Sequence, residues 1–169
     1  YVQKHVLALP SDKFSSIFLN FSAQTSANQS QDIVDSKLDK RRKGIFGPPF
    51  GKRCVIFVDD LNMPQLETYG AQPPVELLRQ WMDHGGWYDL KDCTFRELVD
   101  LQFVSAMGPP GGGRNPVTPR YLRHYNLVWC VDYAQASLEG VFQKILAWHL
   151  EPFPGEVKAL CNTVVQCTA

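Results

Sequence analysis

Hydrophobic residues along the chain fall into two kinds of pattern, short continuous runs and runs with helical spacing. Four continuous runs, rich in β-branched and aromatic residues, predict buried strands at 14–21, 54–58, 101–107 and 127–131. Apolar positions three or four residues apart predict the end of a helix at 1–9 and helices at 25–38, 75–84, 119–125, 138–150 and 156–167. Strands that alternate with helices favour an open, mostly parallel α/β sheet, followed here by a small helical piece.

Turn-forming residues supply the breaks between these elements. A Pro-Pro pair opens the most regular helix, 75–84, and a Gly-Gly pair ends it. Glycines and prolines between 44 and 51 predict a loop or a small hairpin at 45–53. The basic residues between 37 and 43 are expected at the C-terminal end of the helix 25–38, where cations complement the helix dipole: Lys37, Lys40, Arg41, Arg42 and Lys43.

Composition narrows the class of protein. The chain has 169 residues, 44% of them hydrophobic, which suits one globular domain with a buried core. Lys plus Arg and Asp plus Glu number 17 each, so no excess of charge favours nucleic acid or an anionic membrane. The longest apolar runs fall far short of the ~20 residues of a membrane helix, so a soluble protein is expected.

The cysteines and the first residue bear on where the protein works. Five cysteines without a C-x-x-C pair argue against a disulfide framework and a zinc site, and they favour a reducing, intracellular compartment. The chain starts at Tyr1, and its first ten residues lack the apolar core of a secretory signal. Such a start is expected of a cut through a longer polypeptide.

Two acidic residues, Asp59 and Asp60, follow the apolar run 54–58 directly. Ligands of open parallel sheets gather at the carboxyl ends of the strands. In phosphoryl-transfer ATPases a first acid at this place holds the magnesium shell, and a second polar or acidic group orients the attacking water. The alternative is structural, because an acid pair after a strand also caps helices and solvates turns.

Two glycine-rich stretches imitate a phosphate-binding loop, which requires G-x-x-x-x-G-K-[ST] between a strand and a helix. The stretch 47–53 is one residue short and runs into a strand. The stretch 108–115 has the glycine spacing, but Arg114 stands for the lysine and Asn115 for the hydroxyl residue, and it follows the acid pair instead of preceding it. We therefore expect it to form a loop that closes over a site on the neighbouring strand.

Other chemistries receive little support from the sequence. The basic run 40–43 has no interleaved aromatic residues, so a solvated helix end is favoured over a nucleic-acid contact. The four histidines show no metal-ligand spacing, and no serine nucleophile elbow is present. A serine hydrolase and a histidine-ligated metalloenzyme are therefore not favoured.

Several motifs together resemble one protein family. They are N-F-S-A-Q-T at 20–25, K-L-D-K-R-R-K-G at 37–44, F-V-D-D-L-N-M-P at 57–64, Y-G-A-Q-P-P at 69–74 with L-L-R-Q-W at 77–81, and A-M-G-P-P at 106–110. In this combination the chain is similar to axonemal dynein heavy chains, at the third of the six AAA+ modules of the motor ring. The resemblance implies an α/β fold of the AAA+ P-loop NTPase type, a mostly parallel sheet flanked by helices. It further implies a large α/β subdomain at 1–133 and the start of a small helical subdomain at 134–169.

The resemblance also implies roles for individual residues. Asp59 takes the Walker B position that holds Mg²⁺ through water, and Asp60 stands where AAA+ proteins usually carry the catalytic Glu. Gly108 takes the sensor I position, and Arg123 is the arginine finger that reaches the nucleotide of the neighbouring module. Asn115 is a further candidate contact to the nucleotide.

Three departures from the family pattern imply slow hydrolysis. The Walker A loop is expected upstream of Tyr1, Asp60 is one methylene shorter than Glu, and Gly108 offers no side chain where sensor I usually offers Asn. An ångström of misplacement at a reacting group can cost about a hundredfold in rate. The module is therefore expected to bind ATP or ADP with Mg²⁺ in a regulatory or slowly hydrolysing role.

The implied setting is a force-generating ATPase of the cytoplasmic cytoskeleton, in the axoneme of cilia and flagella. Its partners would be the neighbouring AAA+ modules of the same heavy chain, microtubules and axonemal dynein subunits, without nucleic acid or a membrane. Two alternatives stay open. The first is a truncated, non-catalytic AAA+-like interaction domain, and the second is nucleic-acid binding through residues 37–43.

Overall fold

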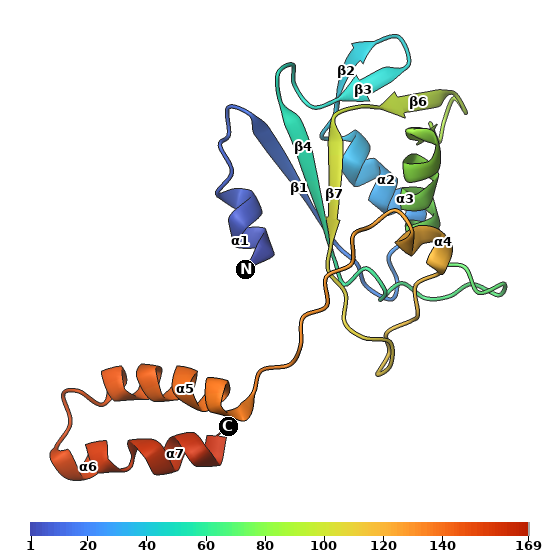
Figure 1. Cartoon of the computed structure of the whole chain (residues 1–169). Coiled ribbons are helices and arrows are strands. Elements are labelled where there is room, and N and C mark those ends of the chain that lie inside the picture. Colours follow the sequence, from blue (N-terminus) through green and yellow to red (C-terminus); the bar gives the residue numbers. More distant parts are fainter. Residues whose placement is uncertain (169) are drawn as a thin grey trace. The chain divides into compact units, whose positions relative to one another are not determined.

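The computed structural model describes residues 1–168 and divides into two compact units, Tyr1–Asn126 and Leu127–Ala169. The first unit contains the described strands and helices α1 to α4, and the second contains helices α5 to α7 (Figure 1). The division after Asn126 precedes the boundary at 133 that the resemblance suggests.

A parallel three-stranded sheet forms the centre of the first unit. Its strands are β1 (Phe14–Asn20), β4 (Arg53–Asp59) and β7 (Leu101–Ser105), in the order β1-β4-β7. Helices α2 (Ala27–Asp35) and α3 (Pro73–His84) lie on one side of this sheet, and α1 (Val2–Leu7) lies on the other (Figure 1). The predicted mostly parallel α/β sheet flanked by helices is thereby confirmed, as are the strands expected at 14–21, 54–58 and 101–107.

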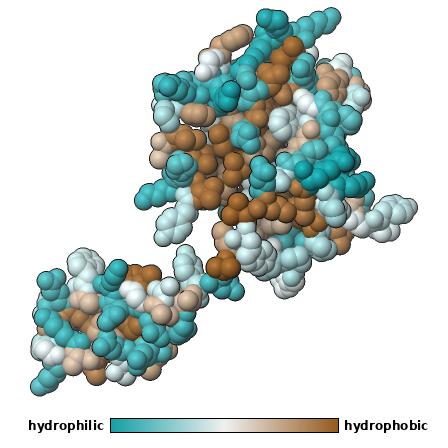
Figure 2. All heavy atoms as spheres, viewed as in Figure 1, coloured by the Kyte–Doolittle hydropathy of each residue, from teal (hydrophilic) through white to brown (hydrophobic). Residues whose placement is uncertain are grey.

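The core of this unit follows from the apolar runs in the strands. Residues 54–58 of the central strand are all buried, as expected for a strand with a neighbour on each side. Ile17 and Leu19 of β1 and Leu78 of α3 belong to the same hydrophobic core. Hydrophobic residues also gather on the face of the unit that Figure 2 shows.

Local signals set the ends of the two covering helices. Ser26 begins α2 with a capping box, because its side chain accepts from the backbone N–H of Gln29 and the Gln29 side chain accepts from the N–H of Ser26. Prolines open α3, and Gly85 ends it in the left-handed conformation with φ 72°. The helix expected at 75–84 is confirmed.

Four of the five basic residues at 37–43 lie away from a helix end, so the prediction was wrong for them; only Lys37 directly follows the C-cap Ser36. Helix α2 ends at Asp35, and the basic residues lie in and beside β2 (Asp39–Arg42), which pairs antiparallel with β3 (Ile45–Gly47). Gly44, with φ 79°, makes the turn between them. Of the loop or hairpin expected at 45–53, residues 45–47 form one strand of this hairpin, residues 48–52 form a loop, and the other strand lies before the expected range.

A second sheet of short strands was not predicted. It has the order β2-β3-β6-β5, where β5 is Gly86–Tyr88 and β6 is Phe95–Leu98. Trp87 of β5 is fully buried, and its indole Nε1–H donates to the Asp35 carboxylate at 3.1 Å. Burial of that carboxylate raises its pKa, although the bonds from Trp87 and Arg96 oppose the shift.

The strand expected at 127–131 is absent, so this prediction was also wrong. Its residues are in irregular structure and exposed, with Val128 85% exposed. A strand requires a neighbour to pair with its backbone, and none of the described strands pairs with this segment. Helix α4 (Pro119–Leu122) is shorter than the helix expected at 119–125.

The second unit is a small helical piece, as the sequence predicted. Helix α5 (Gln135–His149) contacts α7 (Cys161–Thr168), and α6 (Gly155–Ala159) lies between them in the chain. The single helix expected at 156–167 is thus two helices, separated at Leu160. Within residues 1–168, no helix has the length and apolar character needed to cross a bilayer.

Candidate functional site

Asp59 ends the central strand β4 at the carboxyl edge of the parallel sheet. It stands in register with Asn20, the last residue of β1, and its backbone carbonyl accepts from the N–H of Phe21 at 3.0 Å. The side-chain Oδ1 accepts from the N–H of Asp60 at 3.1 Å, and Oδ2 accepts from the Gln3 amide at 3.4 Å. The backbone of its own turn therefore orients this carboxylate.

Asp60 turns the chain sharply away from the strand. Its φ of 52° lies in the left-handed region, which Asp tolerates better than most residues. After this turn the N–H of Leu61 donates to the carbonyl of Ala106 at 3.0 Å, so the segment continues beside the end of β7. The Asp60 side chain is 47% exposed and pairs with Arg114 at 3.7 Å.

Asn62 joins the segment that begins with Asp59 and Asp60, called the acid segment below, to the loop that follows β7. The residue is fully buried, and its Nδ2 donates to the carbonyl of Gly108 at 2.8 Å. Its own carbonyl accepts from the backbone N–H of Asn115 at 2.9 Å and from the buried Gln72 side chain at 3.3 Å. Sequence reasoning missed Asn62 and Gln72, although the D-D-L-N-M-P motif contains the first of them.

Asn115 has a structural partner in this arrangement. Its Nδ2 donates to the carbonyl of Pro64 at 2.8 Å, an oxygen that Gln72 also contacts at 2.7 Å. The predicted nucleotide contact therefore lies beside the acid segment, with its amide engaged in holding the two loops together.

Gly108 lies under the side chain of Arg114. A Cβ at position 108 would lie 2.6 Å from Nε and 2.7 Å from Cδ of that arginine. Gly111 and Arg114 exchange backbone hydrogen bonds of 3.0 and 3.1 Å, so the glycines between them form a tight turn that folds Arg114 back. The absence of a side chain at Gly108 thus leaves room for the arginine.

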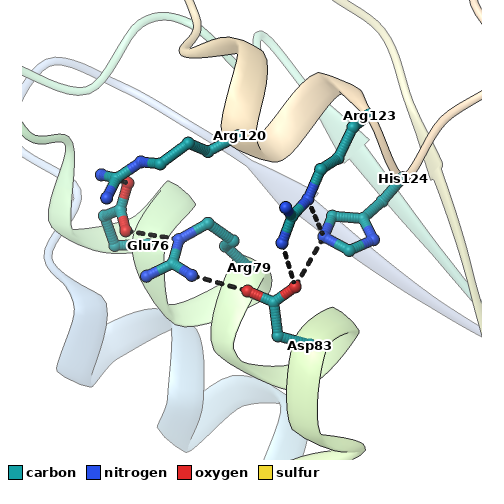
Figure 3. A network of polar contacts seen from close by, with 6 residues as sticks. All are labelled: Glu76, Arg79, Asp83, Arg120, Arg123 and His124. Carbon is teal, nitrogen blue, oxygen red and sulfur yellow. Dashed lines mark hydrogen bonds and ion pairs between the residues drawn. The ribbon is translucent and has the colours of Figure 1, made fainter.

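Arg123 belongs to a separate network of charges between α3 and α4 (Figure 3). Its Nη2 donates to Oδ1 of Asp83 at 2.7 Å, and Nε2 of His124 lies 2.9 Å from the same oxygen. Arg79 donates to the other oxygen at 2.6 Å. The hydrogen bond from Arg123 is the main reason that the pKa of Asp83 lies below its usual value, although desolvation opposes the shift.

The structure therefore brings together four of the five predicted site residues. Asp59, Asp60, Gly108 and Asn115 lie along the edge where β4 and β7 end. Arg123 contacts Asp83 and His124 instead, and no hydrogen bond or ion pair within residues 1–168 joins it to the acid pair.

A chain of three hydroxyl groups links β7 to α4. Ser105 lies 2.9 Å from the Tyr125 hydroxyl, which lies 2.7 Å from the hydroxyl of the fully buried Tyr121. Burial raises the pKa of both tyrosines, so both keep their protons at neutral pH. The end of β7 and the short helix that precedes Arg123 are thereby tied together.

The donor set at the edge fits magnesium in part. Mg²⁺ prefers oxygen ligands and is usually held by one or two carboxylates together with phosphates and water, and Asp59 and Asp60 supply two carboxylates. Throughout the described part of the chain, no group of three or more His, Cys, Asp or Glu side chains forms a complete metal cage. Asn62 also keeps a buried Oδ1 without a partner among the described residues.

A family model decides the relationship that these features suggest. The model described as P-loop containing dynein motor region matches residues 1–133. The chain belongs to this dynein motor region family. The resemblance to axonemal dynein heavy chains and the AAA+ fold class are thus confirmed at the level of the family.

Relatives of this dynein motor region are long proteins. The chain is 62% identical over 144 residues to dynein axonemal heavy chain 1 of Homo sapiens, which covers 85% of this chain and 3% of the relative. It is 57% identical over 144 residues to dynein axonemal heavy chain 3 of Mus musculus, a match that covers 85% of this chain and 4% of the relative. It is 52% identical over 162 residues to dynein axonemal heavy chain 12 of Homo sapiens, a match that covers 95% of this chain and 5% of the relative. The chain therefore spans about a twentieth or less of the relatives it matches.

Proposed function

We propose that the chain is a fragment of the third AAA+ module of an axonemal dynein heavy chain and supplies part of the nucleotide site of that module. In this proposal the ATP or ADP state of the module regulates the motor, and hydrolysis at this module is slow. The observation that carries the proposal is the carboxylate pair Asp59 and Asp60 at the end of the central strand, fastened by Asn62 to the loop after β7. That edge is where open parallel α/β sheets bind their ligands.

Each carboxylate has a separate task in this proposal. Asp59, whose orientation is fixed by the N–H of Asp60, holds the water shell of Mg²⁺, and bound Mg-ATP supplies the electrophilic phosphorus. Asp60 is turned away from the strand and its side chain is half-exposed, so it orients and deprotonates the attacking water. The shorter reach of Asp relative to Glu supports slow turnover.

The phosphate cradle is proposed to come from residues N-terminal to Tyr1. Among the described residues, 47–53 leads into β4, and 111–114 is a tight turn around Arg114. Neither stretch offers the succession of backbone N–H groups at a helix N-terminus that holds phosphates in P-loop proteins. The small share of the relatives that this chain spans supports a longer polypeptide as the working protein.

The domain division, partners and location are proposals of the same kind. Residues 1–133 would form the large subdomain and 134–169 the beginning of the small helical one. The relatives are named axonemal dynein heavy chains, which supports work in the axoneme, on microtubules and beside neighbouring AAA+ modules and dynein subunits.

Two variants in a polypeptide that includes the upstream residues test the nucleotide site. Asp59→Ala should abolish the magnesium dependence of nucleotide binding, whereas Asp60→Asn should preserve binding and lower turnover. Equilibrium binding with and without Mg²⁺, together with single-turnover rates, measures both. Identical behaviour of the two variants in both assays would favour an acid pair that merely ends the strand.

A non-catalytic interaction module is the second candidate function. It is supported by the engagement of Arg123 with Asp83, which leaves that arginine bound within the chain. The sequence immediately N-terminal to Tyr1 separates the two candidates, because only the nucleotide-binding module requires G-x-x-x-x-G-K-[ST] there.

A further inference from the structure

We infer that Arg114 contacts the terminal phosphate of the bound nucleotide and takes over the task of the side chain that Gly108 lacks. This inference rests on the proposed nucleotide site and adds a residue to it. Arg114 is in the glycine-rich stretch 108–115, which does not have the sequence of a phosphate-binding loop. We assign it a role because its side chain lies over Gly108 and beside Asp60.

The backbone around Arg114 is held from both sides. Before it, Gly111 exchanges two backbone hydrogen bonds with it, and the intervening glycines have φ values of 58° and 89° that other residues rarely adopt. After it, Asn115 donates its backbone N–H to the carbonyl of Asn62 and its side-chain amide to the carbonyl of Pro64. Ordering of the loop backbone therefore adds little to the entropic cost when the Arg114 side chain binds an anion.

The side chain lies across Gly108 toward the acid pair. Any side chain at position 108 would overlap it, since an added Cβ would meet Nε at 2.6 Å and Cζ at 3.1 Å. The guanidinium then reaches Asp60, with Nη2 3.7 Å from Oδ1. Gly108 is held in place meanwhile by the Asn62 amide at its carbonyl.

Charge explains why an arginine belongs at this edge. Two carboxylates stand where the polyphosphate is proposed to bind, so the site needs cations besides Mg²⁺ to hold a further negative group. Arg114 is 40% exposed and pairs with Asp60 at the long distance of 3.7 Å, which leaves guanidinium N–H groups for another acceptor. Arginine binds phosphate through two parallel N–H bonds, and such charge-assisted bonds are about twice as strong as neutral ones.

The preference for ATP over ADP tests the inference in the polypeptide that includes the upstream residues. Arg114→Ala should weaken ATP binding by about tenfold or more while leaving ADP binding nearly unchanged, as expected for the loss of one charge-assisted contact. Arg114→Lys should keep part of the preference. Arg42→Ala, at an exposed position in β2, is the matched control and should alter neither affinity.

A double variant separates binding from support of the loop. Gly108→Asn introduces the side chain that sensor I usually carries, in the space that Arg114 occupies, so Gly108→Asn with Arg114→Ala should regain part of the lost preference. Equal loss of ATP and ADP affinity in Arg114→Ala, or an unchanged ratio of the two, would overturn the inference. Asp59→Ala serves as the reference: if it removes magnesium-dependent binding while Arg114→Ala leaves the ratio unchanged, the nucleotide site stands and only the role of Arg114 is wrong.

Discussion

Arg123 is the residue whose role depends most on its surroundings. In the structure its guanidinium forms an ion pair with Asp83, whereas the resemblance implies that it contacts the nucleotide of a neighbouring module. An arginine finger must leave such a contact to act, so the two assignments predict different effects of its removal. The bond to Asp83 would compete with the finger function if both were made by the same guanidinium.

Arg123→Ala in an intact motor separates these assignments. A finger contributes about 10³-fold or more to hydrolysis at the site it faces, so nucleotide handling at the neighbouring module should be impaired while affinity at its own module is unchanged. Affinity, release and turnover at the neighbour measure the effect. Unaltered values for all three in a folded protein would reduce Arg123 to a surface ion pair, which contributes little to stability.

The lowered pKa of Asp83 gives its network a defined pH dependence. Because the folded state holds the carboxylate ionised, the stabilisation is fully present above the unfolded pKa of about 4 and is lost as the pH falls through the lower folded value. Asp83→Asn should therefore lower the melting temperature at pH 5 to 7, and the difference from the unaltered protein should shrink below pH 4. The same comparison should be repeated in a His124→Gln background, because the His124 imidazole contacts the same oxygen of Asp83 as Arg123 does. A difference that stays constant from pH 7 to pH 2 would contradict this network.

At the scale of elements, the hydroxyl chain joins β7 to α4 without any ion pair. Tyr125→Phe should remove the middle hydroxyl, so that the hydroxyls of Ser105 and Tyr121 lose their shared hydrogen-bond partner. We expect the free energy of unfolding to fall by about 1–2 kcal/mol. Tyr88→Phe is the control, because Tyr88 is 56% exposed and surface substitutions usually stay within about 0.5 kcal/mol. Urea unfolding of both variants measures the difference, and equal values would mean that the chain of hydroxyls adds nothing to docking α4.

The sequence predicted the elements that carry their own signal. Residues 54–58 form a continuous apolar run, and α3 has both a proline start and a glycine end, so both were recognisable locally. Strand β5 was missed because it has three residues and is defined by its pairing with β6, whose partner residues lie seven to eleven positions away. The run 127–131 failed as a strand for the opposite reason, since strong β propensity does not replace a pairing partner.

The candidate site was predictable to the same extent. Asp59 and Asp60 are adjacent to a recognisable strand, so their place at its end followed from the sequence. The contacts of Asn62 and Arg114 depend on how the loop after β7 folds back over a segment some 50 residues earlier, which no local pattern contains. From spacing alone, Arg114 stands at the lysine position of a phosphate-binding loop that the sequence does not form. Only its position over Gly108 suggests a task for it.

At the scale of the whole molecule, the chain of 169 residues should bind Mg-ATP weakly. Its acid pair offers two carboxylates, but neither glycine-rich stretch forms a cradle of backbone N–H groups with a lysine for the phosphates. Calorimetry on the chain itself measures this. A dissociation constant in the low micromolar range would place the phosphates elsewhere, and the loop 108–114 would be the first region to mutate.

The order β1-β4-β7 has a consequence for how this chain behaves in concentrated solution. Within residues 1–168, β7 pairs on one side only, and an open strand edge is a template for another chain. The exposed, uncharged run 127–131 has the high β propensity of a strand that can fill such an edge, and a net charge of zero provides no repulsion between copies. Sedimentation should therefore reveal self-association that rises with concentration and that Val128→Lys suppresses more than Val141→Lys, which introduces the same charge at an exposed position on α5. Self-association would then depend on whether the β7 edge is covered, and a partner that pairs with this edge should suppress it.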